Sequence, residues 1–296
     1  MDIVNQLVRY IGERHPMQEK YLEKGLAALS AEDREDLEKV IEFFAVKHTI
    51  EEMGEAYLVF VKDTINETKY FVENDYSRYR YATLSEVNGN VYQNEAYMSQ
   101  YMLGLQLSGY LWDNHRQILH WFREEFLGYE GKNYLEIGPG HGQYFAEAMN
   151  RGKYENYYAI DLSKTSLDMT KEYVQRFAKG SHFELVHENF YDYDPKCLFD
   201  AVCVSEVLEH VEDPYVMIKK IVEITGEGAH IYINVPVNAP AIDHIYLYRT
   251  VDEVKDLVQK AGLKIIKEIA VTGNGWPMEK AIKHKSAINY AVIAVK

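Results

Sequence analysis

Cysteine is scarce in this 296-residue chain: only Cys197 and Cys203 occur, and they do not form a C-x-x-C pair. Both lie in or beside a segment that we expect to be a buried strand. We therefore interpret them as unreactive core thiols and expect a reducing, cytoplasmic setting. Long apolar runs are missing as well. With no stretch of about 18 apolar residues we expect no membrane span, and residues 1–5 do not read as a signal peptide.

Positive charge is in short supply too. The net charge is −14, and the deficit is largest in residues 1–131, which hold 13 Lys and Arg against 23 Asp and Glu. Nucleic acids and anionic lipids are bound by cationic surfaces. We therefore expect neither nucleic acid nor a membrane as partner, and a small molecule as substrate. The sequence is compatible with a dimer but does not indicate one.

Glycines alternate at one point of the chain, where residues 135–142 read LEIGPGHG. A short apolar run with an acid, Glu136, ends there in Gly138, Gly140 and Gly142. This pattern predicts a buried strand that stops at a backbone without side chains. A ligand can lie directly against such a turn and against the N-terminus of the helix that follows.

A second acid follows at the expected distance. Residues 157–161 read YYAID, which predicts another short strand, and Asp161 at its end comes about 20 residues after the glycines, where an acid can accept hydrogen bonds from ribose hydroxyls. The dinucleotide fingerprint G-x-G-x-x-G would need a third glycine at position 143 or 145. Gln143 and Phe145 stand there instead. A nicotinamide dinucleotide is therefore disfavoured.

The pattern E-x-G-x-G-x-G resembles motif I of the class I S-adenosylmethionine (SAM) dependent methyltransferases. Residues 199–214, FDAVCVSEVLEHVEDP, are similar to the fourth strand of that family and its continuation. The resemblance covers about residues 130–296. It implies SAM as cofactor and an α/β, Rossmann-like sheet of seven strands in the order 3-2-1-4-5-7-6.

Residues 132–296 alternate short apolar runs with helical patterns, which is typical of a parallel sheet flanked by helices. The last strand follows the sixth with no helical pattern between them, so we expect it to be antiparallel. The expected strands are 133–137, 156–161, 182–187, 199–205, 229–235, 263–271 and 288–295, and the expected helices are 142–151, 164–179, 214–225 and 250–261.

Residues 1–130 do not resemble a Rossmann half. Helical spacing is present through most of residues 2–63 and again over 102–126. We therefore predict a helical accessory region at 1–130 and the SAM-binding catalytic domain at 131–296. In the family such an extension commonly forms a lid over the cofactor cleft, and the resemblance implies that role here.

Between these helical parts, residues 70–101 are rich in tyrosine and poor in aliphatic residues. Aromatic faces bind sulfonium and ammonium cations, and phenols can orient a carboxylate or an amine. Ordinary packing of a half-exposed surface accounts for most of the tyrosines. We expect two or three of them at the active site, with Tyr92, Tyr97 and Tyr101 as candidates.

The resemblance also implies which residues hold the cofactor. The leading acid helps to hold its ammonium group, the glycine turn faces its amino-acid part, and Asp161 holds the ribose. An amide and an apolar side chain after the third strand would meet the adenine. The expected cofactor-binding residues are Glu136, Gly138, Gly140, Gly142, Asp161, Leu162, Asn189, Phe190, Ser205 and Glu206.

Three residues are candidates for catalysis. His210 follows the fourth strand, while His244 and Tyr246 lie in the long polar loop 234–249 after the fifth. A general base must lie within hydrogen-bond reach of the group from which it takes a proton. Each of these side chains could instead only hold its loop in place. His210 and His244 could also bind a metal, but no third ligand occurs at regular spacing and we predict none.

These features together predict a SAM-dependent methyltransferase that acts on a hydroxyl, amine or acidic carbon of a small metabolite. An alternative keeps SAM but attacks the γ-carbon of its methionine arm. That reaction is aminocarboxypropyl transfer, or cyclisation of SAM to azetidine-2-carboxylate, and it releases methylthioadenosine. A binding protein without catalysis is a third option, against which the intact Glu136, Gly138, Gly140 and Asp161 argue.

Overall fold

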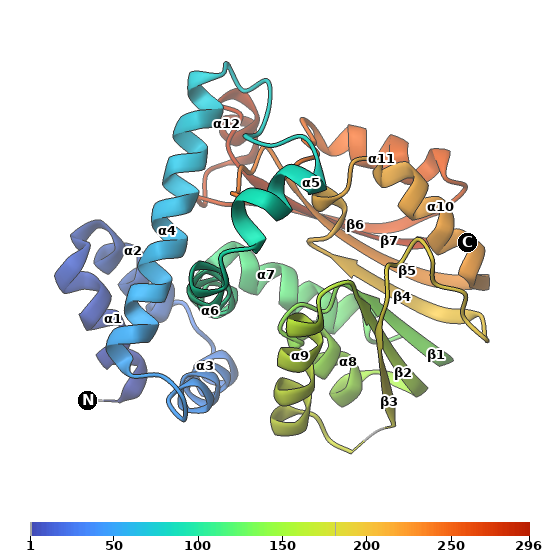
Figure 1. Ribbon diagram of the computed structural model, residues 1–296, viewed down its shortest axis with the longest axis horizontal. Coiled ribbons are helices and arrows are strands. Elements are labelled where there is room, and N and C mark those ends of the chain that lie inside the picture. The colour runs from blue at the N-terminus through green and yellow to red at the C-terminus, as the bar shows by residue number, and fades with distance from the viewer. Residues whose placement is uncertain (1, 181) are drawn as a thin grey trace. The chain divides into compact units, whose positions relative to one another are not determined.

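The computed structural model describes residues 2–180 and 182–296, which form two compact units (Figure 1). Unit 1 comprises the described residues up to Arg80, Ser85–Arg116 and Pro240–Asp243. Unit 2 comprises Tyr81–Leu84, Gln117–Ala239 and His244–Lys296. The division into domains at residue 130 stays a prediction, because compactness does not show that either part folds alone.

Unit 2 is built on a seven-stranded sheet in the order β3-β2-β1-β4-β5-β7-β6, which confirms the predicted topology. Neighbouring strands among the first five pair in parallel, and β7 is antiparallel to both β5 and β6. The strands are β1 (Glu130–Ile137), β2 (Lys153–Asp161), β3 (Phe183–His187), β4 (Phe199–Ser205), β5 (Thr225–Val237), β6 (Lys264–Thr272) and β7 (Ile288–Val295).

The two faces of the central strands differ in character, because successive side chains of a strand point to opposite faces. Leu135, Val204 and Ile233 belong to a large apolar core together with residues of α10 (Pro214–Ile224) and α11 (Val251–Lys260), the helices on that side of the sheet (Figure 1). The residues next to them, Glu136, Ser205 and Asn234, are polar and face the other way. The polar chemistry of the sheet is therefore separated from its main apolar core.

The helices of this unit begin and end close to the predicted positions. α8 (Gln143–Arg151) and α9 (Lys164–Phe177) join α10 and α11, and Ser163 caps α9 by accepting the N–H of Ser166 at 3.2 Å. Thr250 caps α11 in the same way. These caps satisfy N–H groups that have no partner within the helix.

One local prediction was wrong. The link between β6 and β7 was expected to contain no helix, but α12 (Met278–Lys283) lies there. A helix of six residues is too short to produce the apolar repeat on which sequence interpretation depends. The orientation predicted for the last strand is nevertheless confirmed, because β7 is antiparallel to β5 and β6.

Unit 1 is helical, as predicted, and its longest helix, α4, extends ten residues beyond the expected segment. Ser30 and Thr49 begin α3 and α4 with capping boxes. The tyrosine-rich stretch is also largely helical; having few aliphatic residues, it lacks the apolar repeat. The elements of the N-terminal region are α1 (Ile3–Arg14), α2 (Pro16–Ala27), α3 (Ala31–Phe44), α4 (Ile50–Glu73), α5 (Leu84–Val87), η1 (Asn88–Tyr92), α6 (Glu95–Leu111), α7 (Asp113–Trp121) and η2 (Phe122–Phe126).

A glycine sets the close approach of α6 to α4. A Cβ atom at Gly104 would lie 2.3 Å from the carbonyl oxygen of Ala56 and 2.7 Å from Cβ of Phe60. Gly104→Ala should therefore lower the free energy of unfolding by about 1–3 kcal/mol, although alanine is the better helix former. Urea unfolding measures this. Gly89→Ala is the control, since beyond its own backbone surroundings no described atom lies within 4 Å of its Cβ position. Equal midpoints for the two variants would contradict the packing argument.

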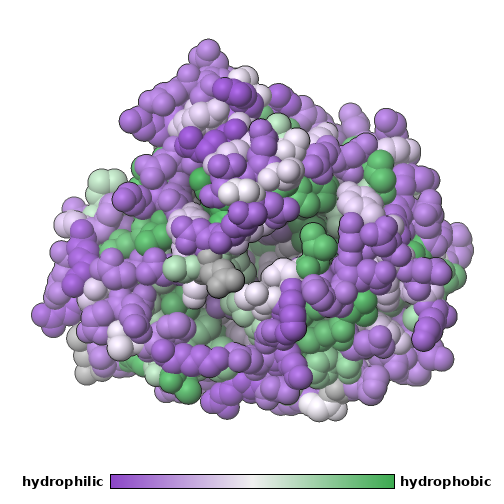
Figure 2. Space-filling view, viewed as in Figure 1, coloured by the Kyte–Doolittle hydropathy of each residue, from purple (hydrophilic) through white to green (hydrophobic). Residues whose placement is uncertain are grey.

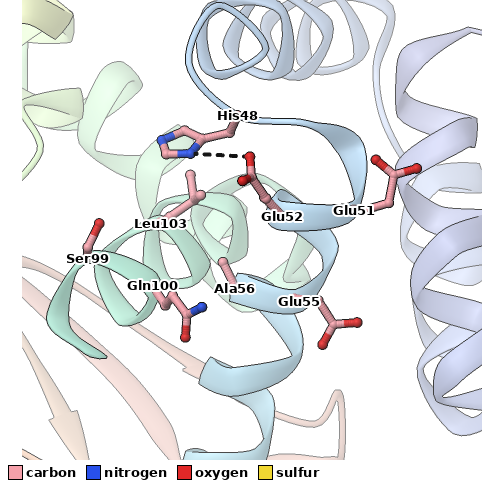
Figure 3. Close-up of a pocket in the computed structure, with 8 residues that line it drawn as sticks. All are labelled: His48, Glu51, Glu52, Glu55, Ala56, Ser99, Gln100 and Leu103. Carbon is pink, nitrogen blue, oxygen red and sulfur yellow. Dashed lines mark ion pairs between the residues drawn. The ribbon is translucent and has the colours of Figure 1, made fainter. Parts of the chain in front are cut away.

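A hollow of about 370 Å³ lies between α4 and α6 within unit 1 (Figure 3). Three of its eight lining residues are glutamates, and Nδ1 of His48 is 4.0 Å from Glu52 Oε2. The residues that line it are His48, Glu51, Glu52, Glu55, Ala56, Ser99, Gln100 and Leu103. These are not the residues of the predicted cofactor site.

Hydrophilic residues predominate on the face of the molecule drawn in Figure 2. Among the residues that the structure describes, no helix has the length and apolar composition needed to cross a bilayer.

Candidate functional site

The loop between β1 and α8 contains three glycines in the left-handed region, with φ of +65° at Gly138, +56° at Gly140 and +90° at Gly142. A Cβ at Gly138 would lie 2.6 Å from Val207 Cγ2, and one at Gly142 would lie 2.8 Å from Thr170 Cα. At Gly140 no atom of the described residues other than its chain neighbours lies within 4 Å of the Cβ position. The outer glycines thus pack against their neighbours, and Gly140 leaves open space in which a ligand can approach the backbone.

Polar groups on both sides of this loop fit a ligand with an amino-acid part. Glu136 at the end of β1 is buried, its Oε2 accepts the Tyr134 hydroxyl at 2.9 Å, and burial raises its pKa to about 8. Gln143 begins α8, and its buried Nε2 has no hydrogen-bond partner among the described residues. A carboxylate can bind an ammonium group, and an unsatisfied amide N–H suits a carboxylate.

Asp161 is the last residue of β2. Its Oδ1 accepts the N–H of Ser163 at 2.7 Å. Burial raises the pKa of Asp161, and the backbone N–H groups of Ser163 and Gly140 act in the opposite direction. The carboxylate is therefore beside the open glycine. Leu162, directly after it, leaves 57% of its surface exposed and so offers an apolar patch next to the acid.

The two residues expected near the adenine follow β3. Asn189 is exposed, and its Oδ1 accepts the N–H of Tyr191 at 3.1 Å. Phe190 is buried and packs within the apolar core of the sheet, in the same cluster as Ile160. Much of its ring is thus already used in packing, and contact of either residue with adenine stays a prediction.

Glu206 directly follows β4 and has a φ of +55°, which is uncommon for a residue with a side chain. Its Oε1 accepts Nδ2 of Asn234 at 2.8 Å and Nδ2 of Asn289 at 3.3 Å. The same Asn234 amide also donates to Ser205 Oγ at 3.1 Å. Burial raises the pKa of Glu206 to about 7, against the effect of the two amides. Groups from β5 and β7 therefore hold a strained acid at the end of β4.

His210 and His244, which are 34 positions apart in the sequence, lie together. Their rings are 5.0 Å apart and nearly perpendicular. Glu209, fully buried, lies beside both: its Oε1 is 3.7 Å from His210 Nε2 and 3.9 Å from His244 Nε2. The backbone N–H groups of Ile245 and Tyr246 both donate to the Glu209 carbonyl at 2.9 Å. The turn after β4 thus organises the loop after β5.

The tautomer of His244 follows from its partner. Nδ1 is 2.7 Å from the carbonyl oxygen of Ala239, so it must carry the hydrogen. In the neutral ring Nε2 then presents a lone pair toward Glu209 and His210, and can accept a proton or bind a metal. One ligand atom from each of these three residues lies within 4.8 Å of the others. We expected no metal because the sequence shows no third ligand at regular spacing. Glu209 could supply that ligand. The expected absence of a metal stays a prediction.

Tyr246 meets this group through its backbone. Its ring packs against Tyr248 with centroids 4.8 Å apart, and burial together with the charges of Glu253 and Asp213 raises its pKa. These charges place the phenol near the start of α11. A catalytic role for Tyr246 stays a prediction.

Glu209 is the main residue that the sequence analysis missed. It is part of the segment 199–214 that resembles the family, and its spacing of three from Glu206, with His210 next to it, was the available signal. Tyr144, in the first turn of α8, was also missed. Its hydroxyl pairs with Ser205, and burial raises its pKa well above the ordinary value. No motif marks it.

The chain is similar in sequence to known methyltransferases. Residues 110–268 match the family model described as a methyltransferase domain. The mitochondrial ubiquinone biosynthesis O-methyltransferase of Dictyostelium discoideum is 29% identical over 117 residues, 36% of this chain and 36% of that protein. The ubiquinone biosynthesis O-methyltransferase of Thiobacillus denitrificans is 31% identical over 104 residues, 35% of this chain and 44% of that protein. The chain thus spans less than half the length of these two relatives.

Among solved structures, the N-methyltransferase NodS of Bradyrhizobium japonicum, in complex with S-adenosylhomocysteine (SAH), aligns with a TM-score of 0.47 and 17% identity. The alignment covers 61% of this chain and 87% of that one. The family model matches more than half of the sequence. The chain belongs to the methyltransferase domain family, the class I SAM-dependent methyltransferases.

Proposed function

We propose that this protein transfers the methyl group of SAM to a small molecule, with a hydroxyl as the favoured acceptor. The observation that carries the proposal is the pairing of two features at the carboxyl ends of neighbouring strands, where open α/β sheets bind ligands. One is the open glycine loop flanked by Glu136 and Asp161, and the other is the Glu209–His210–His244 group. The relatives named as O-methyltransferases support oxygen as the acceptor atom.

The cofactor residues follow from the same geometry. Glu136 would hold the ammonium group, the Gln143 amide the carboxylate, and Asp161 the ribose hydroxyls. When bound, SAM supplies a methyl group on a positively charged sulfur. The chain itself therefore needs mainly to align the acceptor and exclude water. The lid role of residues 1–130, a cytoplasmic location and a small-molecule substrate belong to this proposal and depend on the family resemblance and the acidic charge.

The acceptor is activated by loss of its proton. The lone pair on His244 Nε2 would take that proton, because Nδ1 is already committed to the Ala239 carbonyl. The Glu209 carboxylate beside it would stabilise the imidazolium that forms, and His210 is the neighbouring base. Methyl transfer leaves SAH and the methylated acceptor.

The test is incubation of purified protein with SAM and a panel of phenols, alcohols and amines, followed by mass spectrometry. We expect SAH and an acceptor with one added methyl group, in amounts that match. Methylthioadenosine formed without any acceptor would instead support the alternative, attack at the γ-carbon of SAM. If calorimetry detects no binding of SAH, the protein is a member of the family that does not use SAM.

A second candidate mechanism is favoured by one observation: Glu209, His210 and His244 could together hold a divalent cation, which would lower the pKa of an acceptor hydroxyl bound to it. For this mechanism we expect calorimetry to detect a single bound Mn²⁺ and chelation to abolish methyl transfer. Glu209→Gln should lose the metal. Glu223→Gln, an exposed acid on α10, should keep it. Full activity after chelation would leave the histidine base as the mechanism.

A further inference from the structure

The loop that carries His244, residues 238–249, is closed at its base. Val237 and Tyr248 form an isolated bridge, the N–H of Asn238 donates to the Tyr248 carbonyl at 2.9 Å, and its side-chain amide donates to the Arg249 carbonyl at 2.8 Å. Between these ends the loop is divided. Pro240–Asp243 belongs to unit 1, and His244 onward belongs to unit 2.

Within unit 1, two phenols hold Asp243. The hydroxyl of Tyr92 donates to Oδ2 and that of Tyr101 donates to Oδ1, both at 3.3 Å. The carboxylate is 8% exposed, and the Tyr101 ring is itself fixed between Tyr97 and Phe60, at 5.9 and 5.4 Å. Burial, together with the Asp243 charge, raises the pKa of Tyr101 well above its usual value. Its phenol therefore stays protonated and remains a donor.

Within unit 2, the next residue in the chain has its own restraints. The imidazole of His244 donates to Ala239, and the two residues after it donate to the Glu209 carbonyl. Consecutive Cα atoms are about 3.8 Å apart. A shift of Asp243 must therefore move His244 or break one of these hydrogen bonds.

We propose that Asp243, held by Tyr92 and Tyr101, is a positioning residue for His244. The two phenols hold Asp243 in place. This keeps the imidazole of His244 oriented so that Nδ1 donates to the Ala239 carbonyl and Nε2 points toward Glu209. The proposal deepens the proposed function, since His244 is the base there, but the placement of the ring can be measured without any acceptor.

The experiment uses the double variant Tyr92→Phe/Tyr101→Phe, which removes both donors and keeps both rings. Nitrogen NMR of the histidine side chains, with His244 assigned by His244→Gln, reports the tautomer. We expect the wild type to show hydrogen on Nδ1 and the variant to show a mixture. Amide exchange at Ile245 and Tyr246 should be at least about tenfold faster, the effect of losing one or more hydrogen bonds to a charged group.

Tyr10→Phe is the matched control, because its hydroxyl donates to Glu55 at 2.9 Å in the same unit and Glu55 precedes no catalytic candidate. It should change neither signal. Asp243→Asn keeps the shape of the side chain, and we expect a smaller change in the same direction. If the double variant fails to fold, this variant decides the question.

An unchanged tautomer and unchanged exchange in the double variant and in Asp243→Asn would overturn the proposal. SAH calorimetry separates this outcome from failure of the proposed function. If the wild type does not bind SAH, the proposed methyltransferase function is wrong, but the NMR result on the placement of His244 remains valid. Where SAH binds, the double variant should keep its affinity within about twofold and lose at least about tenfold in kcat, with little change in the KM for SAM.

Discussion

Replacing Asp161 with alanine should weaken SAH binding by about a hundredfold or more. The carboxylate at the end of β2 lies beside the backbone of Gly140, where it can accept both ribose hydroxyls. A hydrogen bond to a charged group contributes about 1.5–3 kcal/mol, so the loss of two exceeds a hundredfold in affinity. Isothermal calorimetry with SAH measures it directly.

The control is Asp168→Ala, which removes an exposed acid of α9 that pairs with Lys164 and should leave SAH affinity unchanged. The stability of Asp161→Ala is a second control. Because burial raises the pKa of this carboxyl, ionising it costs folding energy, and its removal should not unfold the protein. A variant that stays folded and binds SAH as tightly as wild type would contradict the assigned ribose site.

The position of Asp161 could be predicted because of a general property of parallel sheets. The carboxyl ends of neighbouring parallel strands meet at one edge, so an acid that ends one strand and glycines that end the next must lie near each other. Gly140 illustrates this well. Its place in the motif predicted open space, and apart from its chain neighbours no atom in the described part of the chain lies within 4 Å of its Cβ position.

The contact of His210 with His244 could not be predicted in the same way. The two residues follow different strands, and the loop that carries His244 is closed by hydrogen bonds between its own ends. No local pattern specifies such a closure. Asn289 is a similar case, because it reaches Glu206 only through the pairing of β7 with β5. Contacts of this kind depend on the register of distant strands.

The tyrosine-rich segment shows a different limit. Its helices lack the apolar repeat, and nothing in the order of its tyrosines distinguishes Tyr101, bound to Asp243, from Tyr97, whose hydroxyl donates to Asp63 at 2.7 Å. Chemistry alone made these residues candidates. Their contacts depend on the path of residues 240–243, which are far away in the sequence.

Glu136→Gln should separate stability from binding more clearly than any other single change. Burial raises the pKa of Glu136 from 4.5 to about 8 in the folded protein. Between these values the folded state binds more protons than the unfolded state, so the contribution of Glu136 to stability falls as pH rises from about 4.5 to 8. Glutamine does not ionise, so the variant does not lose this stability as pH rises. The variant should equal the wild type below pH 4.5 and exceed it by on the order of a few kcal/mol near pH 8.

Thermal unfolding without ligand across this pH range measures the difference. Glu155→Gln, an exposed acid on β2, is the control and should follow the wild type at every pH. A stability difference that stays constant with pH would show that Glu136 has the same pKa in the folded and the unfolded protein.

Binding should change in the opposite direction, and the pH dependence identifies the charge that matters. The ammonium group of SAH needs the carboxylate form of Glu136, so wild-type affinity should rise as pH approaches 8. The amino group of SAH also titrates, but it does so identically with either protein. The ratio of the two affinities therefore reports Glu136 alone. It should favour the wild type increasingly from pH 6 to 8, and a ratio independent of pH would show that the ammonium group is held elsewhere.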